Sequence, residues 1–397
     1  MPPVTGPAQP EVKPTPEPAG PDRTEPPASG TRVDEAPPRA GSVDARLNMV
    51  ILSEEFDQIT LAEFAKFVRD LTALPVTLQL DAMLAEGLTT DTELAIHVRT
   101  VTVRQMIETA LKPVALTLVI DDKQLVISTP AALSHEQVAK TYAVGDLAAD
   151  ATRIQALADM VTSLIAPQSW KAVGGPGEIS TTEQALVVTQ TSVVQFQVTR
   201  FLDRLRVARG LLPRGDLLGP LIDLRPVFVQ AAKALEQPVS LRITQATPVA
   251  GILQRLEAET DLNILVNWRQ VGTTGMTPRT ESTLMGDGKP LRVLLNTWLG
   301  PAKLAFRVVD PRTIEISTQE DIDARPEVDV YRLKHAPKQD AEIAKLIDDA
   351  KEYVGSAYFS SDGGTGTLRY ESSVHCLIAS LPQPRQRALA KWLADRR

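Results

Sequence analysis

From about Leu47 onward, the order of apolar and polar positions predicts short helices and strands in turn. Apolar side chains recur at helical spacing over residues 60–71 and again over 103–111, which is typical of helices with one buried face. Segments with the apolar alternation of half-buried strands lie between and after these helices, at 75–80, 93–99, 115–120 and 124–129. With a strand before the first helix, this part is predicted to run strand, helix, two strands, helix, two strands.

The same pattern returns later in the chain. Arg104 and Pro113 of the second helix region match Arg292 and Pro301, both at a spacing of 188 residues (292 − 104). One extra residue in the turn DPRT then changes the spacing to 189, which aligns the Ile-Ser-Thr that begins at Ile127 with the Ile-Ser-Thr that begins at position 316 (316 − 127). Identities at a fixed spacing indicate a repeat, because helical periodicity alone would require only apolar character.

The correspondence continues at the spacing of 189. Tyr142 in KTYAVGDL matches Tyr331 in DVYRLKHA, and an apolar helix, a glycine cluster, a strand and a final helix follow in both copies. The clusters are Gly174, Gly175 and Gly177 in the first copy and Gly363, Gly364 and Gly366 in the second. A repeat of this length is far too long for a solenoid, so it indicates a tandem duplication of a two-domain block.

We therefore predict an α+β protein of four small mixed α/β domains in the order A-B-A′-B′, behind a disordered leader. The predicted boundaries are 1–45 for the leader, 46–136 and 137–208 for the first copy, 209–237 for a linker with a short helix, and 238–324 and 325–397 for the second copy. Residues 1–40 hold twelve of the thirty prolines and no aromatic residue, a composition that favours a semi-stiff disordered spacer. A proline-rich ligand for a small recognition domain is the alternative for this segment.

Two kinds of segment resemble known families. ITLAEFAKFVRDLTALPVTLQL followed by VTVRQMIETALKPVALTLVIDDKQLVIST resembles the short N-terminal domain of secretins and TonB-dependent receptors. The segments that open with KTYAVGDL and DVYRLKHA resemble the KH-like domains that follow it in secretins. The resemblance covers about residues 46–397 and includes no secretin pore domain. It implies non-enzymatic modules of the periplasm that form rings or docking sites, with sheet edges and helix faces against neighbouring copies or envelope proteins.

Composition restricts the function classes. The chain has 397 residues, a formal net charge of −7 and only 4% aromatic residues, which disfavours nucleic-acid binding because that depends on clustered cations and stacking rings. Its single cysteine, Cys376, excludes an intrachain disulfide. No apolar run approaches the length of a transmembrane helix, and MPPVTGPAQP predicts no signal peptide. We expect the periplasm or cell envelope from the resemblance, with the cytoplasm as the alternative.

The glycine clusters are the most prominent candidate site. GGPG and GGTG both fit the Gly-x-x-Gly loop with which KH domains hold a nucleic-acid backbone. That loop joins two helices, whereas each cluster here directly precedes a strand, and Glu178 and Asp362 beside the glycines would repel phosphate. We therefore interpret the six glycines as structural turn residues that allow positive φ in a hairpin.

Other candidate chemistry is sparse, and we predict no catalytic, metal-binding or cofactor-binding residues and no small-molecule ligand. Trp170 and Trp268 lie at the ends of predicted elements and are candidate exposed interaction residues. HEQVA at His135 lacks the second histidine of the helical zinc motif. Cys376 follows His375 but occupies an apolar strand, which favours a buried side chain over a nucleophile.

The leading hypothesis is a non-catalytic envelope scaffold that binds protein partners or itself. The alternatives are a cytoplasmic nucleic-acid-binding protein and, less favoured, an envelope hydrolase. The copies also differ: Glu315 stands where the first copy has Val126, on the face opposite Leu125 and Ile127. We expect one copy to cover that face and the other to leave it exposed to water.

Overall fold

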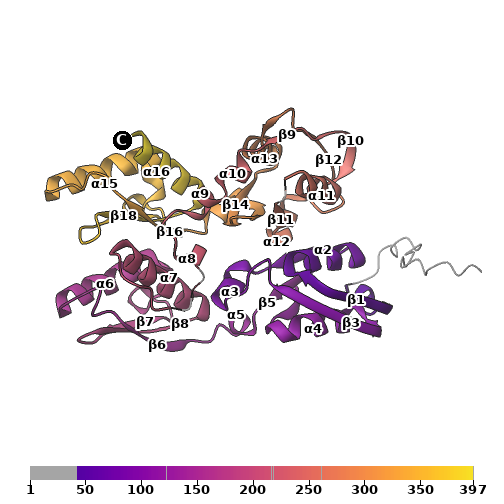
Figure 1. Ribbon diagram of the computed structural model, residues 1–397, viewed down its shortest axis with the longest axis horizontal. Coiled ribbons are helices and arrows are strands. Elements are labelled where there is room, and N and C mark those ends of the chain that lie inside the picture. The colour runs from indigo at the N-terminus through magenta and orange to yellow at the C-terminus, as the bar shows by residue number, and fades with distance from the viewer. Residues whose placement is uncertain (1–42, 122, 216, 218, 261, 397) are drawn as a thin grey trace, which may run out of the picture. The chain divides into compact units, whose positions relative to one another are not determined.

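The computed structural model of the protein describes residues 43–396, except residues 122, 216, 218 and 261 (Figure 1). Following the boundaries predicted from the sequence, we call residues 43–136 unit A1, 137–208 unit B1, 238–324 unit A2 and 325–396 unit B2. Residues 209–237 are called the linker. The predicted leader lies outside the described residues up to position 42, and its last residues, 43–45, belong to helix α1 (Val43–Leu47).

Unit A1 contains the predicted series of elements with additional short helices. After α1 come β1 (Val50–Thr60), α2 (Leu61–Thr72), β2 (Val76–Leu78), α3 (Leu80–Ala85), β3 (Glu93–Thr102), α4 (Val103–Leu111), η1 (Lys112–Val114), β4 (Thr117–Asp121), β5 (Gln124–Ser128) and α5 (Pro130–Ser134). The strand expected at 75–80 is shorter than predicted because Leu80 already begins α3.

Local sequence signals fix the two main helices of A1. Thr60 caps α2 and Thr102 caps α4, each in a reciprocal pairing with a residue three positions later, Glu63 and Gln105. β1 pairs antiparallel with β3 in a two-stranded ribbon. β5 is the middle strand of a second sheet, parallel to β2 and antiparallel to β4. The helices thus begin directly where the ribbon strands end.

Unit B1 is a three-stranded antiparallel sheet with two long helices. Its elements are β6 (Val138–Ala143), α6 (Ala151–Leu164), η2 (Pro167–Ser169), η3 (Lys171–Val173), β7 (Glu178–Thr181), β8 (Ala185–Gln190) and α7 (Ser192–Ala208). The strand order is β6-β8-β7. The linker then holds three short helices where one was predicted: α8 (Gly219–Ile222), α9 (Val227–Gln230) and α10 (Ala232–Leu235).

Unit A2 repeats the main helices and strands of A1 and adds two short strands, and B2 repeats the order of B1. A2 consists of β9 (Pro238–Val239), β10 (Arg242–Pro248), α11 (Val249–Thr260), β11 (Asn263–Val266), α12 (Trp268–Val271), η4 (Gly272–Thr274), β12 (Glu281–Met285), β13 (Lys289–Pro290), α13 (Leu291–Leu299), η5 (Gly300–Ala302), β14 (Leu304–Asp310), β15 (Thr313–Thr318) and α14 (Gln319–Asp323). B2 consists of β16 (Glu327–Arg332), α15 (Asp340–Val354), η6 (Ser356–Tyr358), η7 (Ser360–Asp362), β17 (Thr367–Glu371), β18 (Cys376–Leu381) and α16 (Gln383–Asp395).

The three-stranded sheets of the two halves have the same topology. The order β11-β15-β14 in A2, with one parallel and one antiparallel pairing, repeats β2-β5-β4 in A1. The antiparallel order β16-β18-β17 in B2 repeats β6-β8-β7 in B1. The mixed α/β class with small sheets is confirmed for the described chain. The duplication stays a prediction, which this agreement supports.

Each unit has its own apolar core, and two of these cores extend into a neighbouring unit. Leu265 of A2 packs into the core of A1. Val330, Cys376 and Ile378 of B2 pack into the core of B1. Burial of apolar surface across these joints stabilises the arrangement of the units as well as each unit. None of the helices within the described residues is long and apolar enough to span a bilayer.

Candidate functional site

The two glycine clusters form closed loops with the same internal hydrogen bonds. In B1 the N–H of Gly177 donates to the carbonyl of Ser169 at 2.8 Å, and the N–H of Lys171 donates to the carbonyl of Gly177 at 2.7 Å. In B2 the N–H of Gly366 makes the equivalent bond to Tyr358 at 2.7 Å, and that of Ser360 makes the equivalent bond to Gly366 at 2.9 Å. Each loop is therefore folded back on its own preceding turn.

The glycines are needed for two different reasons. Gly174 and Gly363 adopt φ values of 94° and 90°, the positive region that glycine enters without strain. A Cβ on Gly175 would collide with the main chain of Ser169, and one on Gly364 would collide with that of Tyr358. The expectation of positive φ thus holds for one glycine in each cluster, while close main-chain approach explains the glycine after it.

The predicted hairpin is wrong in one respect, because each loop joins a helix to a strand. Two 3-10 turns connect α6 to β7, and two others connect α15 to β17. Gly177 and Gly366 are each the last residue before their strand, which leaves no second helix for a KH-type phosphate loop. The geometry therefore favours a structural turn over a nucleic-acid clamp.

Both candidate interaction tryptophans are buried, so the expectation that they are exposed is wrong. Trp170 is 2% exposed, and its indole N–H donates to the carbonyl of Ile165 at 2.8 Å. Its main chain forms a β-bridge with Gly177, as that of Phe359 does with Gly366 in B2, so both buried aromatic residues belong to the base of a glycine loop. Trp268 is 5% exposed and belongs to the core of A2.

Cys376 is a core residue, as the apolar strand pattern predicts. Its side chain is buried in β18, and burial raises the pKa of the thiol to about 11. His375 makes no ion pair to it within the described residues; its Nδ1 lies 3.2 Å from the Tyr370 hydroxyl. A thiol held neutral and away from a base is not an activated nucleophile.

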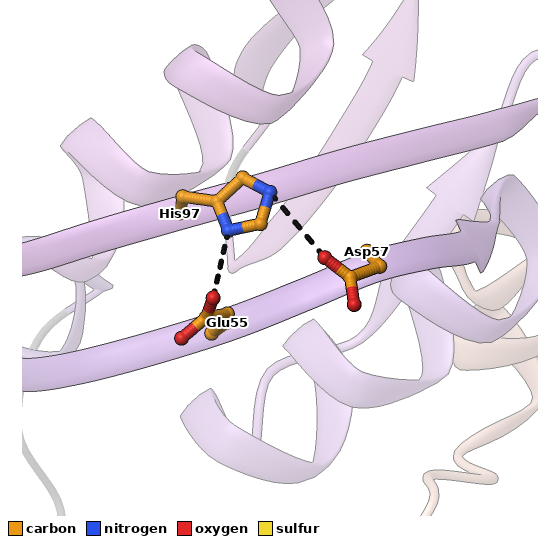
Figure 2. Close-up of side chains that lie close together, drawn as sticks. All are labelled: Glu55, Asp57 and His97. Carbon is orange, nitrogen blue, oxygen red and sulfur yellow. Dashed lines mark ion pairs between the residues drawn. The ribbon is translucent and has the colours of Figure 1, made fainter.

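One cluster of metal-type side chains lies on the exposed face of the A1 ribbon (Figure 2). His97 of β3 is the cross-strand partner of Glu55 in β1. Its Nδ1 lies 3.3 Å from a Glu55 carboxylate oxygen and its Nε2 lies 3.8 Å from one of Asp57. The two ring nitrogens face different carboxylates and all three side chains are exposed, so the geometry describes surface contacts of one imidazole with two carboxylates.

Sequence reasoning missed this cluster for a simple reason. The alternation of 93–99 already places His97 opposite the buried Leu94, Ile96 and Val98. The first strand was predicted without residue bounds, so its pairing register and the partner of His97 stayed unknown.

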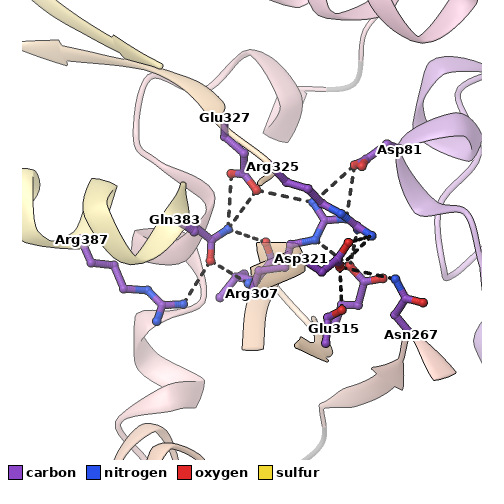
Figure 3. A network of polar contacts seen from close by, with 11 residues as sticks. Asp81, Asn267, Arg307, Glu315, Asp321, Arg325, Glu327, Gln383 and Arg387 are labelled. Atoms are coloured by element: carbon purple, nitrogen blue, oxygen red, sulfur yellow. Dashed lines mark hydrogen bonds and ion pairs between the residues drawn. The ribbon is translucent and has the colours of Figure 1, made fainter. Parts of the chain in front are cut away.

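The main polar feature is a buried charge network around Arg307 of β14, shown in Figure 3. The Arg307 guanidinium lies 2.6 Å from Glu315 of the neighbouring strand β15, 3.3 Å from Asp81 of A1 and 3.5 Å from Glu327 of B2. Arg325 adds a second cation at 3.3 Å from the same Glu315 oxygen. A single cation thereby connects carboxylates from three units.

Gln383, at the start of α16, connects the network to the main chain of A2. Its amide nitrogen donates to the carbonyl of Val308 at 2.7 Å, and its amide oxygen accepts from the N–H of Val308 at 2.8 Å. The same nitrogen lies 3.3 Å from a Glu327 oxygen. These bonds satisfy polar groups that would otherwise be buried without partners.

Asp81 and Glu327 contact the same arginine, but their pKa values are shifted in opposite directions. Burial acts to raise the pKa of the Asp81 carboxyl, but the charges of Arg307 and Arg325 outweigh it and bring the pKa below its usual range. Burial likewise raises the pKa of Glu327, and the charge of Arg307 offsets this only in part because Asp329 raises it further. The network therefore stabilises one ionised carboxylate and disfavours another.

Glu315 is 3% exposed, so the expectation that its face is exposed to water is wrong. All residues of β15 are buried, as are all residues of β5 in A1. The two copies differ in how this buried face is packed. Val126 makes apolar contacts, whereas Glu315 forms ion pairs with Arg307 and Arg325.

A cavity of about 310 Å³ lies beside the network. Its lining is largely apolar and includes Leu164, Phe201 and Val328, with the charged side chains Arg307 and Arg325. These cations already pair with carboxylates of the network, so they do not offer free charge to a ligand.

The helix face of B1 packs on the outer sheet face of B2. Arg204 of α7 lies 3.0 Å from the Asp329 carboxylate, and both side chains are buried. The hydroxyl of Ser380 in β18 donates to the carbonyl of Leu164 in α6 at 2.8 Å, and Thr367 donates to Ser163 at 3.1 Å. One unit therefore contributes helices and the other contributes a sheet, so the contact is head-to-tail.

Comparison with protein-family models and with curated proteins finds no match. Among solved structures the chain is similar to the V. cholerae type IV competence pilus secretin PilQ, with 18% identity, a TM-score of 0.17, and 39% of this chain and 37% of that chain covered. It is similar to XcpQN012, with 12% identity, a TM-score of 0.15, and 40% and 65% covered. It is similar to a dimer mutant of the N-terminal domain of the secretin XcpQ from Pseudomonas aeruginosa, with 9% identity, a TM-score of 0.15, and 87% and 98% covered.

A likeness to secretin N-terminal domains is thus found in solved structures as well as in the sequence. The chain spans 37% and 65% of the length of the first two. With TM-scores this low, these matches carry no argument about activity or partners, which must come from the chain's own residues.

We predict that Gly175→Ala lowers the free energy of unfolding by about 2 kcal/mol, because the new Cβ must displace the main chain of Ser169. Gly145→Ala in the same unit is the matched control, since its Cβ would meet only ordinary contacts with Gln184 at 3.7 Å. Urea unfolding followed by tryptophan fluorescence measures both. Equal effects of the two substitutions would contradict the close-approach explanation.

Arg307→Met is expected to cost about 3 to 5 kcal/mol, because it leaves Glu315 buried with only one of its two cations. Adding Glu315→Leu should recover most of this loss, since the double variant has no unpaired buried carboxylate at this position. Arg269→Met breaks an exposed ion pair with Asp121 between A1 and A2, and it should cost less than about 1 kcal/mol. Chemical denaturation compares the four proteins, and an Arg307 effect as small as that of Arg269 argues against the network as a stabilising joint.

Because the pKa of Asp81 is lowered and that of Glu327 is raised, we predict that replacing each by its amide changes the stability of the fold in opposite directions. Asp81 has a lowered pKa in the folded state, so its carboxylate adds stability above pH 3.8 that is lost as the pH falls. Glu327 has a raised pKa, so its contribution is present below pH 4.5 and is lost as the pH rises through the folded value. At pH 7 we expect Asp81→Asn to destabilise and Glu327→Gln to stabilise the fold, with both differences shrinking at pH 3. The free energy of unfolding of each variant is compared with that of the unsubstituted protein at both pH values. If both variants change it in the same direction at pH 7, this assignment is wrong.

Proposed function

We propose that this chain is a non-catalytic interaction protein of the cell envelope, which binds copies of itself or protein partners through sheet edges and helix faces. The main observation that supports this proposal is the head-to-tail packing of B1 on B2. Such a contact uses two different surfaces, the helices of B1 and the sheet of B2. The sheet of B1 and the helices of B2 are therefore not used in it.

The sheet face of B1 is the first unused surface. In β18 of B2 every residue is buried, because one face covers the core of B2 and the other packs on B1. In β8 of B1 buried and partly exposed residues alternate, so only one face is covered. Val187 and Thr189 lie on the open face, at the positions that correspond to Cys376 and Ile378 in B2.

The part of the B2 helix face formed by α15 is the second unused surface, because α16 already contacts A2 through Gln383 and Ala390. In α7 of B1 all residues from Phe201 to Arg206 are buried, since α7 contacts its own sheet, the linker and B2. In α16 burial is confined to one stripe, and in α15 only Ala350 and Val354 are buried. Tyr353 on α15 is 48% exposed and lies 6.4 Å from the ring of Trp392. Trp392 itself is buried, so the exposed ring of this surface is that of Tyr353, a residue type enriched at protein contacts.

These two surfaces belong to opposite ends of the same head-to-tail arrangement. The helix face of B2 in one chain can meet the sheet face of B1 in the next chain, and repetition of that contact generates a ring or a filament. The open sheet face carries more threonine and less isoleucine than its buried counterpart, which favours a weaker contact than the one inside the chain.

A non-enzymatic role is part of the proposal. The candidate nucleophile Cys376 is buried, the glycine loops are closed on themselves, and Arg307 and Arg325 beside the cavity pair with carboxylates. The resemblance of the sequence to secretin modules supports the envelope as the location. It also supports the duplicated A-B-A′-B′ organisation as part of this proposal.

Self-association is tested by sedimentation velocity of the full chain over protein concentrations up to about 0.3 mM. We expect the sedimentation coefficient to rise with concentration, and Tyr353→Glu or Val187→Glu to reduce that rise by placing a charge in the contact. Val173→Glu is the matched control, because Val173 is exposed on the glycine loop outside both faces. A chain that stays monomeric, and that retains no protein partner in an extract of its own cells, would overturn the proposed function.

A further inference from the structure

Beyond Val328, the outer edge of the B2 sheet has main-chain groups that bond to no other strand among the described residues. β16 is an edge strand in the order β16-β18-β17. Directly after it, the N–H of Leu333 donates to the carbonyl of His375 at 3.0 Å. Successive residues of a strand direct their main-chain groups to opposite sides. The N–H and C=O groups of Val330, Arg332 and Lys334 therefore point away from β18, toward the open side.

This edge lines a groove of about 800 Å³. Residues 330–335 contribute to its lining together with Val229 of the linker and with Leu346 and Leu393 of the B2 helices. The linker is held beside the edge by Arg204, which donates to the carbonyls of Val328 and Leu224 at 2.7 and 3.1 Å. The open part of the edge therefore begins after Val328 and runs toward His335.

The charge of the groove is one-sided. Among its described lining residues there is no aspartate or glutamate, although the chain as a whole has a formal net charge of −7. The lining includes Arg225, Arg332, Lys334, Arg396 and His335. Arg225 and Arg396 pair with nearby carboxylates of the chain, whereas Lys334 has no ion pair in the part of the chain that the structure describes. An occupant with alternating acidic and apolar side chains would match both the cations and the apolar lining.

We propose that an extended acidic segment of a partner protein binds in this groove as an added strand on β16. Main-chain pairing with the residues from Val330 to Lys334 supplies affinity, and alternate side chains supply specificity, as in other strand-addition complexes. The lining positions 330–335 correspond to a segment of about six residues, roughly 20 Å long. This inference rests on the proposed function and assigns one of its binding surfaces and the chemistry of its partner.

The test uses a fluorescent seven-residue peptide that alternates glutamate with valine, and fluorescence anisotropy with dilute full-length protein. We expect saturable binding that weakens at high salt, and no binding of the same peptide with lysine in place of glutamate. Lys334→Glu should weaken binding at least about tenfold, because it turns attraction into repulsion at the rim. Lys289→Glu, an exposed lysine in A2, is the matched control and should leave the affinity unchanged.

Two N-methylated forms of the peptide distinguish strand addition from simple charge attraction. One form is methylated at the odd-numbered residues and the other at the even-numbered residues. The form that lacks the N–H groups that pair with β16 should not bind, whereas the other form should bind like the parent peptide. Equal binding of both forms, or no binding of the parent, overturns the proposal.

The proposal and the function on which it rests fail in distinguishable ways. In sedimentation velocity, Lys334→Glu should leave self-association unchanged, because Lys334 lies just beyond the end of β16, whereas the proposed contact is made by Tyr353 of α15 and Val187 of β8. Loss of self-association in this variant would show that a second copy occupies the groove, which overturns the proposed partner. A monomeric chain that binds the parent peptide would refute self-association and keep the groove.

Discussion

The arrangement of the units depends on the buried guanidinium of Arg307. It contacts Glu315 of its own unit A2 as well as Asp81 of A1 and Glu327 of B2, so moving A1 or B2 away would break one of its ion pairs. Burial acts to lower its pKa, but the charges of Asp81, Glu315 and Glu327 outweigh it and raise the pKa well above the usual value. A buried ion pair contributes little net stability compared with apolar packing, yet breaking it is costly, and this asymmetry favours one specific arrangement.

Given that joint, the head-to-tail contact of B1 with B2 follows a consistent division of surfaces. The outer face of B2 carries Val330, Cys376 and Ile378, and these residues pack into the core of B1. The corresponding face of B1 carries threonine and valine and is left partly exposed. The same domain type is thus present in two surface chemistries, one adapted to a permanent contact within the chain and one compatible with a reversible contact outside it.

Much of the fold could be predicted from the sequence because its signals are local. The apolar stripes and the threonine caps at Thr60 and Thr102 determine α2 and α4, and alternation determines the buried face of β3. Long-range contacts were not accessible in this way. The burial of Trp170 depends on its packing in the core of B1, and the pairing of His97 with Glu55 depends on a register that no local pattern specifies.

The replacement of Val126 by Glu315 shows why a comparison of copies cannot by itself distinguish an exposed face from a buried one. A carboxylate in a strand suggests exposure, because burying an isolated charge is expensive. That cost is offset here by Arg307, which stands where the first copy has Val119 (307 − 119 = 188). Val119 and Val126 are cross-strand partners in A1, and Arg307 and Glu315 are cross-strand partners in A2. The two substitutions form one exchange of an apolar pair for an ion pair, and the excess charge of Arg307 is what reaches Asp81 and Glu327 and joins the units.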